Sequence, residues 1–173
     1  LTDEKYFGGC TADLEKARLA TALPIIRKDF VMDEYQVVEA RAMGADVILL
    51  IAACLSPERV KQLAAFAHSL HLEVLLELHA EEELAHVCDE ADMIGINNRN
   101  LKNFEVNLDQ SVQLAEKLPS GKIRIAESGI HSVDSLLYLR QKGFDGFLMG
   151  EYFMKQQDPA VAFAEFRHQL DSI

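Results

Sequence analysis

The sequence has little of what marks several classes of protein. It contains only nine Gly and four Pro in 173 residues, and 49% of it is hydrophobic. This composition therefore does not fit a collagen-like fibre or a disordered chain. No run of about 18 apolar residues is present, so no segment is predicted to span a membrane. The opening LTDEKYFGGC lacks the basic and apolar regions of a signal peptide.

Cysteine is scarce as well. Cys10, Cys54 and Cys88 are odd in number and far apart, and no CxxC pair occurs. This usage indicates a reducing compartment, the cytoplasm, and predicts that the three side chains are small buried hydrophobes. His68 and His71 have no third ligand at metal-site spacing, so they are interpreted as surface or interface histidines and no metal site is predicted.

Basic residues are outnumbered by acidic ones. Lys plus Arg is 17 and Asp plus Glu is 28, which gives a formal net charge of −11. This balance argues against nucleic acid or an anionic membrane as the main partner. A small anionic ligand held by a local basic cluster remains compatible with it.

Short apolar runs alternate with helical patterns along the whole chain. The runs are rich in Ile, Val and Leu, as in strands that are buried on both faces of a parallel sheet. They lie at 23–27, 47–53, 73–78, 92–97, 122–127 and 145–150. Helices are predicted at about 11–21, 33–43, 56–70, 80–88, 109–118 and 132–142, and from 158 onward. The chain is thus predicted to be a single α/β domain over 1–173, with six complete βα units and a leading helix.

Two architectures fit this alternation, an open doubly wound sheet and part of a barrel. The strand starts average roughly 24 residues apart, so eight units would need about 195 residues before any decoration. No GxGxxG or GxxxxGK[ST] motif follows a strand, which weakens the nucleotide-binding interpretations of an open sheet.

Polar side chains stand where the predicted strands end. Lys28, Glu77, Asn97 and Glu127 end four separate strands, and in parallel α/β folds this edge carries the active site. A solvated strand terminus remains the alternative for any one of them. Together they predict a site in which Lys28 polarises a carbonyl or acts as general acid, Glu77 transfers a proton and Asn97 donates to a hydroxyl or carbonyl.

Basic side chains and two glycine-containing turns are also predicted to belong to this site. Arg27, Lys28 and Arg99 would supply the positive charge that an anionic substrate needs, and Arg99 offers a fork for a carboxylate. The turns SGI at 128–130 and GEY at 150–152 follow the last two strands and each precede a helix. Such a pair of turns is the usual phosphate cradle of a barrel.

The motifs RKDF, LLELHAEEEL, GINNRNLKNFEV, AESGI and GFLMGEYFM together resemble indole-3-glycerol phosphate synthase, and the resemblance covers essentially the whole chain. It implies a (β/α)8 TIM barrel of tryptophan biosynthesis. It implies an enzyme that closes the indole ring of 1-(2-carboxyphenylamino)-1-deoxyribulose 5-phosphate, with loss of carbon dioxide and water. The implied partner is this phosphorylated small molecule, and no metal or organic cofactor is implied.

The resemblance also implies roles for single residues. Lys28 matches the general acid that activates the ketose carbonyl, and Glu77 the acid/base of the later dehydration. Asn97 and Arg99 match contacts to the substrate's hydroxyl and anthranilate groups, and Glu127 a carboxylate at or just behind the substrate.

The resemblance further assigns binding residues. Ser128, Gly129, Gly150 and Glu151 match the phosphate site, the last two through their backbone. Phe7 is similar to the aromatic side chain that packs on the substrate ring, although an ordinary hydrophobic residue at the barrel mouth is an equal interpretation.

One part of the family pattern is missing. The family's first strand carries a catalytic Glu and a Lys followed by Ser-Pro-Ser, and by this alignment Leu1 falls at the end of the second strand. The chain is therefore expected to lack roughly the first two βα units. One alternative is a catalytically incomplete fragment: a scaffold, a piece completed by another chain, or a partial barrel that self-associates through open strand edges. The other is a related phosphosugar barrel such as phosphoribosylanthranilate isomerase, which does not predict RKDF, LLELH and GINNRN together.

Overall fold

The computed structural model describes residues 1–99 and 105–173 of the chain. The described residues form two compact units, Leu1–Ile94 and Gly95–Ile173. The strands follow one another in chain order from β1 to β6, and the boundary between the units falls inside β4, Met93–Asn97. The single domain that the sequence predicts over 1–173 stays a prediction.

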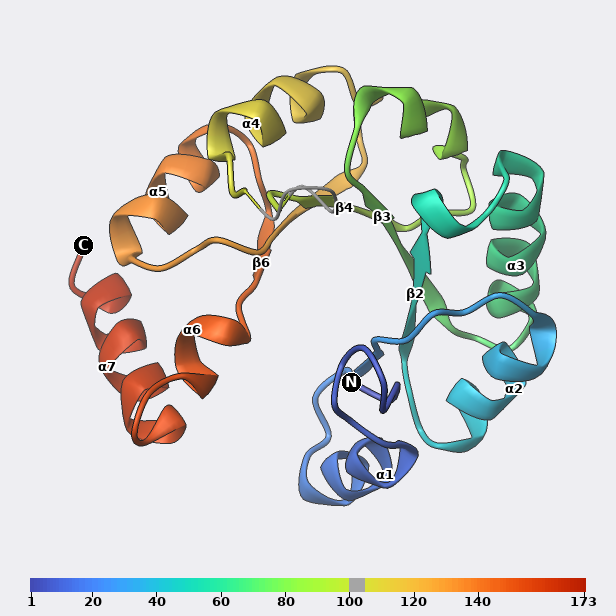
Figure 1. The fold of residues 1–173 in the computed structure, drawn as a ribbon, viewed down its shortest axis with the longest axis horizontal. Helices are drawn as coiled ribbons and strands as arrows, with labels where there is room; N and C mark the ends of the chain where they lie inside the picture. The colour runs from blue at the N-terminus through green and yellow to red at the C-terminus, as the bar shows by residue number, and fades with distance from the viewer. Residues whose placement is uncertain (100–104) are drawn as a thin grey trace. The chain divides into compact units, whose positions relative to one another are not determined.

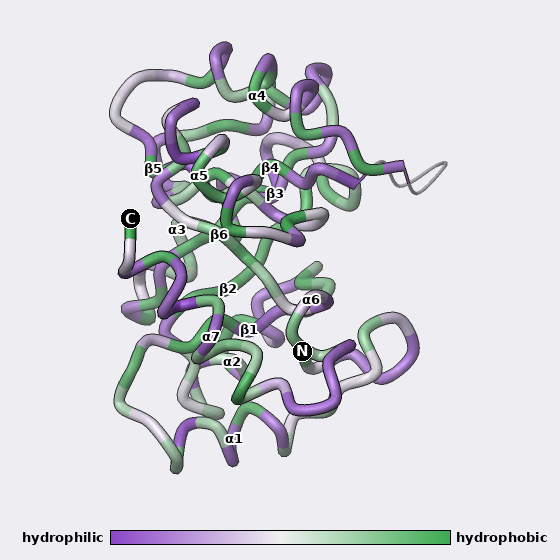
Figure 2. The backbone as a smooth tube through the Cα atoms, turned by 90° about the vertical axis from the view of Figure 1, so that its left-hand side faces the viewer, coloured by the Kyte–Doolittle hydropathy of each residue, from purple (hydrophilic) through white to green (hydrophobic). Residues whose placement is uncertain are grey.

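The first unit is built on three parallel strands, β1 (Ile26–Arg27), β2 (Val47–Ile51) and β3 (Glu73–Leu78). In their register Arg27 stands opposite Ile48, and Ile51 opposite Glu77. All five residues of β2 are buried, and Figure 2 shows this strand in the hydrophobic colour. A strand that is apolar throughout is what a parallel sheet covered on both faces requires.

The helices of the first unit begin where the sequence places caps. They are α1 (Thr11–Ala20), α2 (Glu34–Ala42) and α3 (Pro57–Ser69), and a short 3-10 helix, η1 (Ala52–Cys54), follows β2. The side chains of Asp33 and Ser56 accept hydrogen bonds from the first turns of α2 and α3. Helix α3 packs on β3 with Val60 and Leu63 fully buried, and α2 lies beside it (Figure 1).

Two expected elements of this unit differ from the prediction. Residues 23–25 precede the short strand β1 because Leu23 O and Ile25 N–H bond to the side chains of Arg18 and Asp46. The helix expected at 80–88 is a 3-10 helix, η2 (Glu81–His86). It ends when Val87 N–H donates to Leu84 O, three residues back.

The second unit contains two parallel strands, β5 (Ile123–Glu127) and β6 (Gly146–Leu148), with Glu127 opposite Leu148. Its helices are α4 (Leu108–Glu116), α5 (Val133–Gln141), α6 (Glu151–Met154) and α7 (Pro159–Asp171). Helices α4, α5 and α7 start at side-chain caps, Asn107, Ser132 and Asp158. Each of the six strands is followed by a helical segment, which confirms the six βα units and the leading helix.

Hydrophobic burial departs from the prediction in two places. Phe166 of α7 is buried against Tyr152 and Phe153, but Phe163, which the helical spacing of three residues places on the same face, is 55% exposed. The three cysteines were expected to be buried, and this was wrong. Cys54 is exposed and the other two thiols are half-buried, because all three lie outside regular strands and long helices.

In the described part of the chain, no helix is long and apolar enough to cross a membrane.

Candidate active site

Two of the predicted catalytic residues meet in the first unit. Lys28 follows β1 directly, and Glu77 lies near the carboxyl end of β3. Lys28 Nζ lies 2.9 Å from Glu77 Oε2, which forms an ion pair between residues 49 positions apart. The Glu77 side chain is only 6% exposed and that of Lys28 is 24% exposed. A buried carboxylate beside an ammonium group that still reaches solvent is a suitable arrangement for proton transfer.

The other oxygen of Glu77 faces a histidine that is not among the predicted site residues. His79 Nε2 lies 3.0 Å from Glu77 Oε1, and His79 Nδ1 lies 3.8 Å from Glu83 Oε2. Burial alone would lower the pKa of His79, but the contacts with Glu77 and Glu83 and their charges outweigh it and raise this pKa to about 9. The signal was the spacing in LELHAEEEL, because residues two apart in a strand share a face.

Cys54 also belongs to the surroundings of these carboxylates. It ends η1, after β2. Partial burial, and then the negative charges of Glu77 and Glu83, raise the pKa of its thiol above the ordinary value. The thiol is therefore held in its neutral form near neutral pH.

Phe7 is placed against another aromatic ring. Its ring stacks on Phe30 with centroids 4.9 Å apart and planes 5° from parallel, and Tyr6 meets Phe30 edge-on at 5.5 Å. Phe7 and Phe30 are half-buried. The stacking contact with Phe30 therefore fixes the position of the Phe7 ring. The contact between Phe7 and the substrate stays a prediction.

Arg27 does not supply charge to a site, contrary to the expectation. Its side chain is 3% exposed and forms ion pairs with Asp29 at 3.0 Å and Glu39 at 2.6 Å. It also donates to Gln36 O at 2.7 Å and to Thr2 Oγ1 at 3.2 Å. The reason is alternation, since neighbouring residues in extended backbone point to opposite sides, and Lys28 takes the other side.

In the second unit, three consecutive polar residues follow the same alternation. Asn97 Oδ1 accepts a hydrogen bond from Arg99 N–H at 3.1 Å. Asn98, which is not among the predicted site residues, is 4% exposed. Its backbone N–H donates to Glu127 O at 2.8 Å, and its Nδ2 donates to Ser128 O at 2.7 Å. Residues 100–104 of the GINNRNLKNFEV motif lie outside the described residues.

Arg99 forms an ion pair with Glu151, the first residue of α6. Glu151 pairs with Lys155 as well, and the contact with Lys155 and then that with Arg99 lower the pKa of this carboxyl. The guanidinium group of Arg99, which was predicted to bind a substrate carboxylate, thus binds the carboxylate of Glu151 in this structure. A substrate carboxylate would have to displace or join it.

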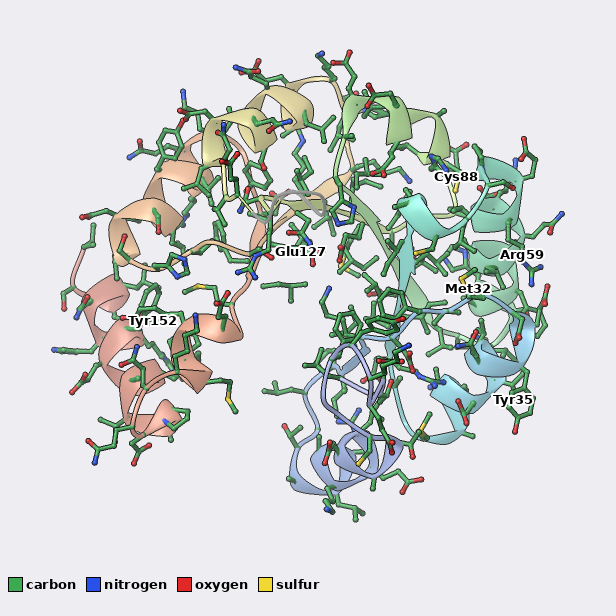
Figure 3. All side chains as sticks on the ribbon, in the orientation of Figure 1. Met32, Tyr35, Arg59, Cys88, Glu127 and Tyr152 are labelled. Atoms are coloured by element: carbon green, nitrogen blue, oxygen red, sulfur yellow. The ribbon has the colours of Figure 1, made fainter. Side chains whose placement is uncertain are left out.

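The phosphate turn that the sequence predicts after β5 has an unusual backbone. Glu127 ends β5 and is 2% exposed; Figure 3 labels its side chain. Ser128 and Gly129 follow with φ of 65° and 71°, both in the left-handed region. A Cβ added at Gly129 would lie 2.1 Å from Val106 Cγ1, so only glycine fits there. Gly150 has open space around it, since nothing described lies within 4 Å of an added Cβ.

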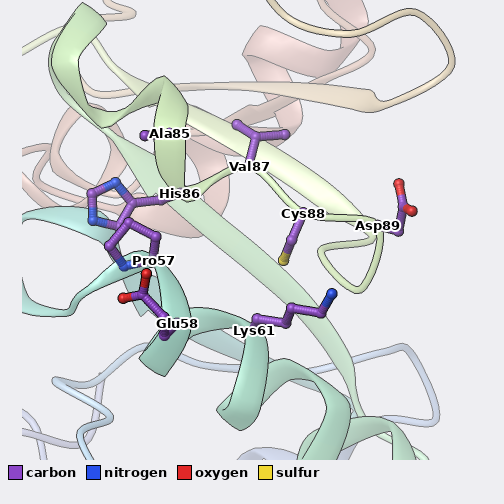
Figure 4. Close-up of a pocket in the computed structure, with 8 residues that line it drawn as sticks. All are labelled: Pro57, Glu58, Lys61, Ala85, His86, Val87, Cys88 and Asp89. Carbon is purple, nitrogen blue, oxygen red and sulfur yellow. The ribbon is translucent and has the colours of Figure 1, made fainter.

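A hollow of about 410 Å³ lies elsewhere in the first unit (Figure 4). It is lined by Pro57, Glu58 and Lys61 of α3 and by residues 85–89. None of the residues predicted for the site lines it. Within residues 1–99 and 105–173, no group of three or more His, Cys, Asp or Glu side chains is placed to hold a metal ion.

A family model described as indole-3-glycerol phosphate synthase matches residues 1–166. The chain belongs to this family. The indole-3-glycerol phosphate synthase of Bacteroides thetaiotaomicron is 49% identical over 166 residues, which is 96% of this chain and 64% of the relative. That of Albidiferax ferrireducens is 48% identical over 166 residues, with 95% and 63% covered. The chain thus spans slightly less than two thirds of the length of these indole-3-glycerol phosphate synthases.

Solved structures support the predicted fold class. A mutant tryptophan synthase alpha-subunit from Pyrococcus furiosus has a TM-score of 0.71 at 15% identity, covering 94% of this chain and 72% of that chain. A chain of the tryptophan synthase complex from the same organism gives 0.69 at 15% identity, covering 94% and 73%. At this identity the likeness concerns the fold alone. Together with the six βα units, this likeness confirms the predicted fold class of the chain, an α/β fold of the (β/α)8 barrel type.

Proposed function

We propose that this chain carries catalytic groups of an indole-3-glycerol phosphate synthase of tryptophan biosynthesis. The substrate would be 1-(2-carboxyphenylamino)-1-deoxyribulose 5-phosphate, and the enzyme a carboxy-lyase that needs no metal or organic cofactor. The observation that carries the proposal is the ion pair between Lys28 and Glu77 at 2.9 Å, in a chain of this family.

The first unit would supply the proton chemistry. The aromatic carbon that bears the carboxylate attacks the ketose carbonyl carbon, and Lys28 donates the proton that the carbonyl oxygen takes up. The carboxylate then leaves as carbon dioxide, and its bonding electrons restore the ring. In the last step, loss of the hydroxyl as water needs a proton on the leaving oxygen and removal of one from the ring system. Glu77 is suited to this transfer because Lys28 beside it can exchange the proton.

The second unit would supply substrate contacts. Asn97 and Arg99 are proposed to bind the hydroxyl and carboxylate groups, and Glu127 to orient them from the end of β5. The phosphate is proposed to bind at Ser128, Gly129, Gly150 and Glu151. Gly150 supports this, because it has no side chain to separate a phosphate from the backbone and nothing described lies within 4 Å of where a Cβ would stand.

Partners and location are part of the same proposal. The partner would be the phosphorylated substrate, with no nucleic acid or membrane involved. A cytoplasmic location is supported by three cysteines that are free thiols.

The test is a steady-state assay of indole-3-glycerol phosphate formation by the chain. Lys28→Ala and Glu77→Gln are each expected to lower kcat at least about a hundredfold, the scale of a lost general acid or base. Lys61→Ala is a matched control, because Lys61 is 64% exposed on α3 and pairs weakly with Glu90 at 3.6 Å. Near-normal turnover by either variant would remove that residue's role. A chain that binds the substrate without any turnover would instead support the incomplete fragment.

Substrate binding is tested separately. Gly150→Asp is expected to raise KM, because it places a negative charge beside the phosphate in space that is otherwise open. Ser120→Asp is the control, because it adds the same charge at an exposed turn residue whose φ is not positive. Equal KM values for the Gly150 variant and the unsubstituted chain would contradict the phosphate assignment.

A further inference from the structure

Four ionisable side chains of the first unit form a row: Lys28, Glu77, His79 and Glu83. Their charges alternate along the row when His79 is protonated, and consecutive members lie 2.9, 3.0 and 3.8 Å apart. They come from three segments: the end of β1, the end of β3 and η2. The proposed proton chemistry uses only the first two members, so the other two need an explanation.

The contacts of Glu77 are divided between its two oxygens. Oε2 faces Lys28 Nζ, and Oε1 faces His79 Nε2. A carboxylate with a cation at only one oxygen can still turn about its last side-chain bond, because that rotation is soft. A positive imidazole 3.0 Å from Oε1 restricts this rotation by charge attraction, without a hydrogen bond aligned to either ring nitrogen of His79.

His79 is in turn fixed from its other side. Glu83 Oε2 lies near His79 Nδ1 and also accepts the backbone N–H groups of His79 at 2.6 Å and Ala80 at 3.3 Å. Glu83 is therefore tied to the backbone at the start of η2. The imidazole, 8% exposed, lies between an anchored carboxylate and the proposed catalytic one.

We propose that His79 is a positioning residue for Glu77: its imidazolium holds Oε1 and keeps Oε2 directed at Lys28. The catalytic consequence rests on the proposed function of Glu77, but the pairing itself does not. The residue would raise turnover through the geometry of Glu77 rather than by touching the substrate.

The surroundings support a protonated imidazole. Burial opposes the charge, yet the two carboxylates raise the pKa of His79 to about 9, and the contact with His79 helps to lower the pKa of Glu83 despite burial. Within the row, Lys28 lies on the far side of Glu77 from His79, and outside the row the thiol of Cys54 in η1 feels the charges of Glu77 and Glu83.

The pairing is tested by NMR titration of the histidine rings in the 173-residue chain between pH 5 and pH 10. The His79 resonance is expected to titrate near pH 9, and Glu77→Gln to move this midpoint down by at least about one pH unit. His71→Asn is the control, because His71 is exposed in the turn before β3 and its φ of 58° suits Asn. A His79 midpoint near 6.5 in the unsubstituted chain, or no response to Glu77→Gln, would overturn the proposal.

The catalytic consequence is tested with two substitutions that keep different donors. Gln at 79 places an amide near the position of Nε2 and can still hold Oε1, whereas Asn places its amide near Nδ1 and cannot. We expect His79→Asn to lower kcat at least about tenfold with KM within about twofold, and His79→Gln to retain at least about a third of kcat. Equal and full turnover by both would overturn the positioning role and leave the proposed function intact. If the unsubstituted chain has no turnover, the proposed function fails for this chain, and the titration alone decides the pairing.

Discussion

The raised pKa of His79 predicts that the stability of the first unit depends on pH. The ordinary histidine pKa of 6.5 applies to the unfolded chain, and about 9 applies to the folded one. The folded state therefore binds this proton more tightly. The resulting stabilisation is fully present below pH 6.5, decreases as the pH rises, and is lost once the pH passes about 9.

The size of the effect follows from the same two values. Each tenfold difference in proton affinity corresponds to about 1.4 kcal/mol, so the interval from 6.5 to about 9 gives at most about 3–4 kcal/mol. Water reaches the row through Lys28, and Glu83 is only half-buried, so screening reduces this figure. We expect the free energy of unfolding to fall by about 2 kcal/mol.

Urea unfolding followed by circular dichroism at pH 6, 7.5 and 9 measures this decrease. The series ends at pH 9 because burial raises the pKa of Cys54 and Cys88, whose ionisation adds a further loss at higher pH. His79→Gln should remove most of the pH dependence, and His71→Asn should keep it. The reasoning is refuted if the chain loses no stability over this range, or if the Gln variant loses as much.

Three other predictions follow from single contacts. Arg27→Met should lower the free energy of unfolding by about 3–5 kcal/mol, because it leaves buried carboxylate without its cation; a loss below 1 kcal/mol in urea unfolding would contradict this. Gly129→Ala should cost at least about 2 kcal/mol, since it combines left-handed backbone with a contact 2.1 Å from Val106; an unchanged urea midpoint would be the contrary result. Cys54 should react slowly with iodoacetamide at pH 8, and Glu77→Gln should speed this reaction; mass spectrometry of the modified peptide measures it, and equal rates would remove the electrostatic cause.

Local signals in the sequence were sufficient for most elements. Asp33 and Ser56 start helices α2 and α3 as predicted, because a cap acts on N–H groups two or three residues away. The buried strand β2 was equally clear from its uninterrupted apolar run. The prediction failed where distant side chains replace backbone partners, as at Leu23 and Ile25.

The candidate site was predicted in part. Position at strand ends was enough to single out Lys28 and Glu77, but not to show that their side chains meet. His79 and Asn98 were missed because the partners that hold their side chains, Glu83 and Ser128, come from other segments, and residue order does not show these contacts. The proposed roles of the site residues remain predictions.

The sequence by itself determined the family, the βα alternation and the residues that end the strands, because all of these depend on residue order and short-range patterns. Only the tertiary structure decided which neighbouring charge faces which way. The side chain of Arg27 is buried and forms ion pairs with carboxylates of its own surroundings. Lys28, one residue later, pairs with Glu77 on the other side of the backbone. The physical reason is that ion pairs at about 3 Å depend on strand register and side-chain rotamers, which residues tens of positions apart fix only when the chain is folded.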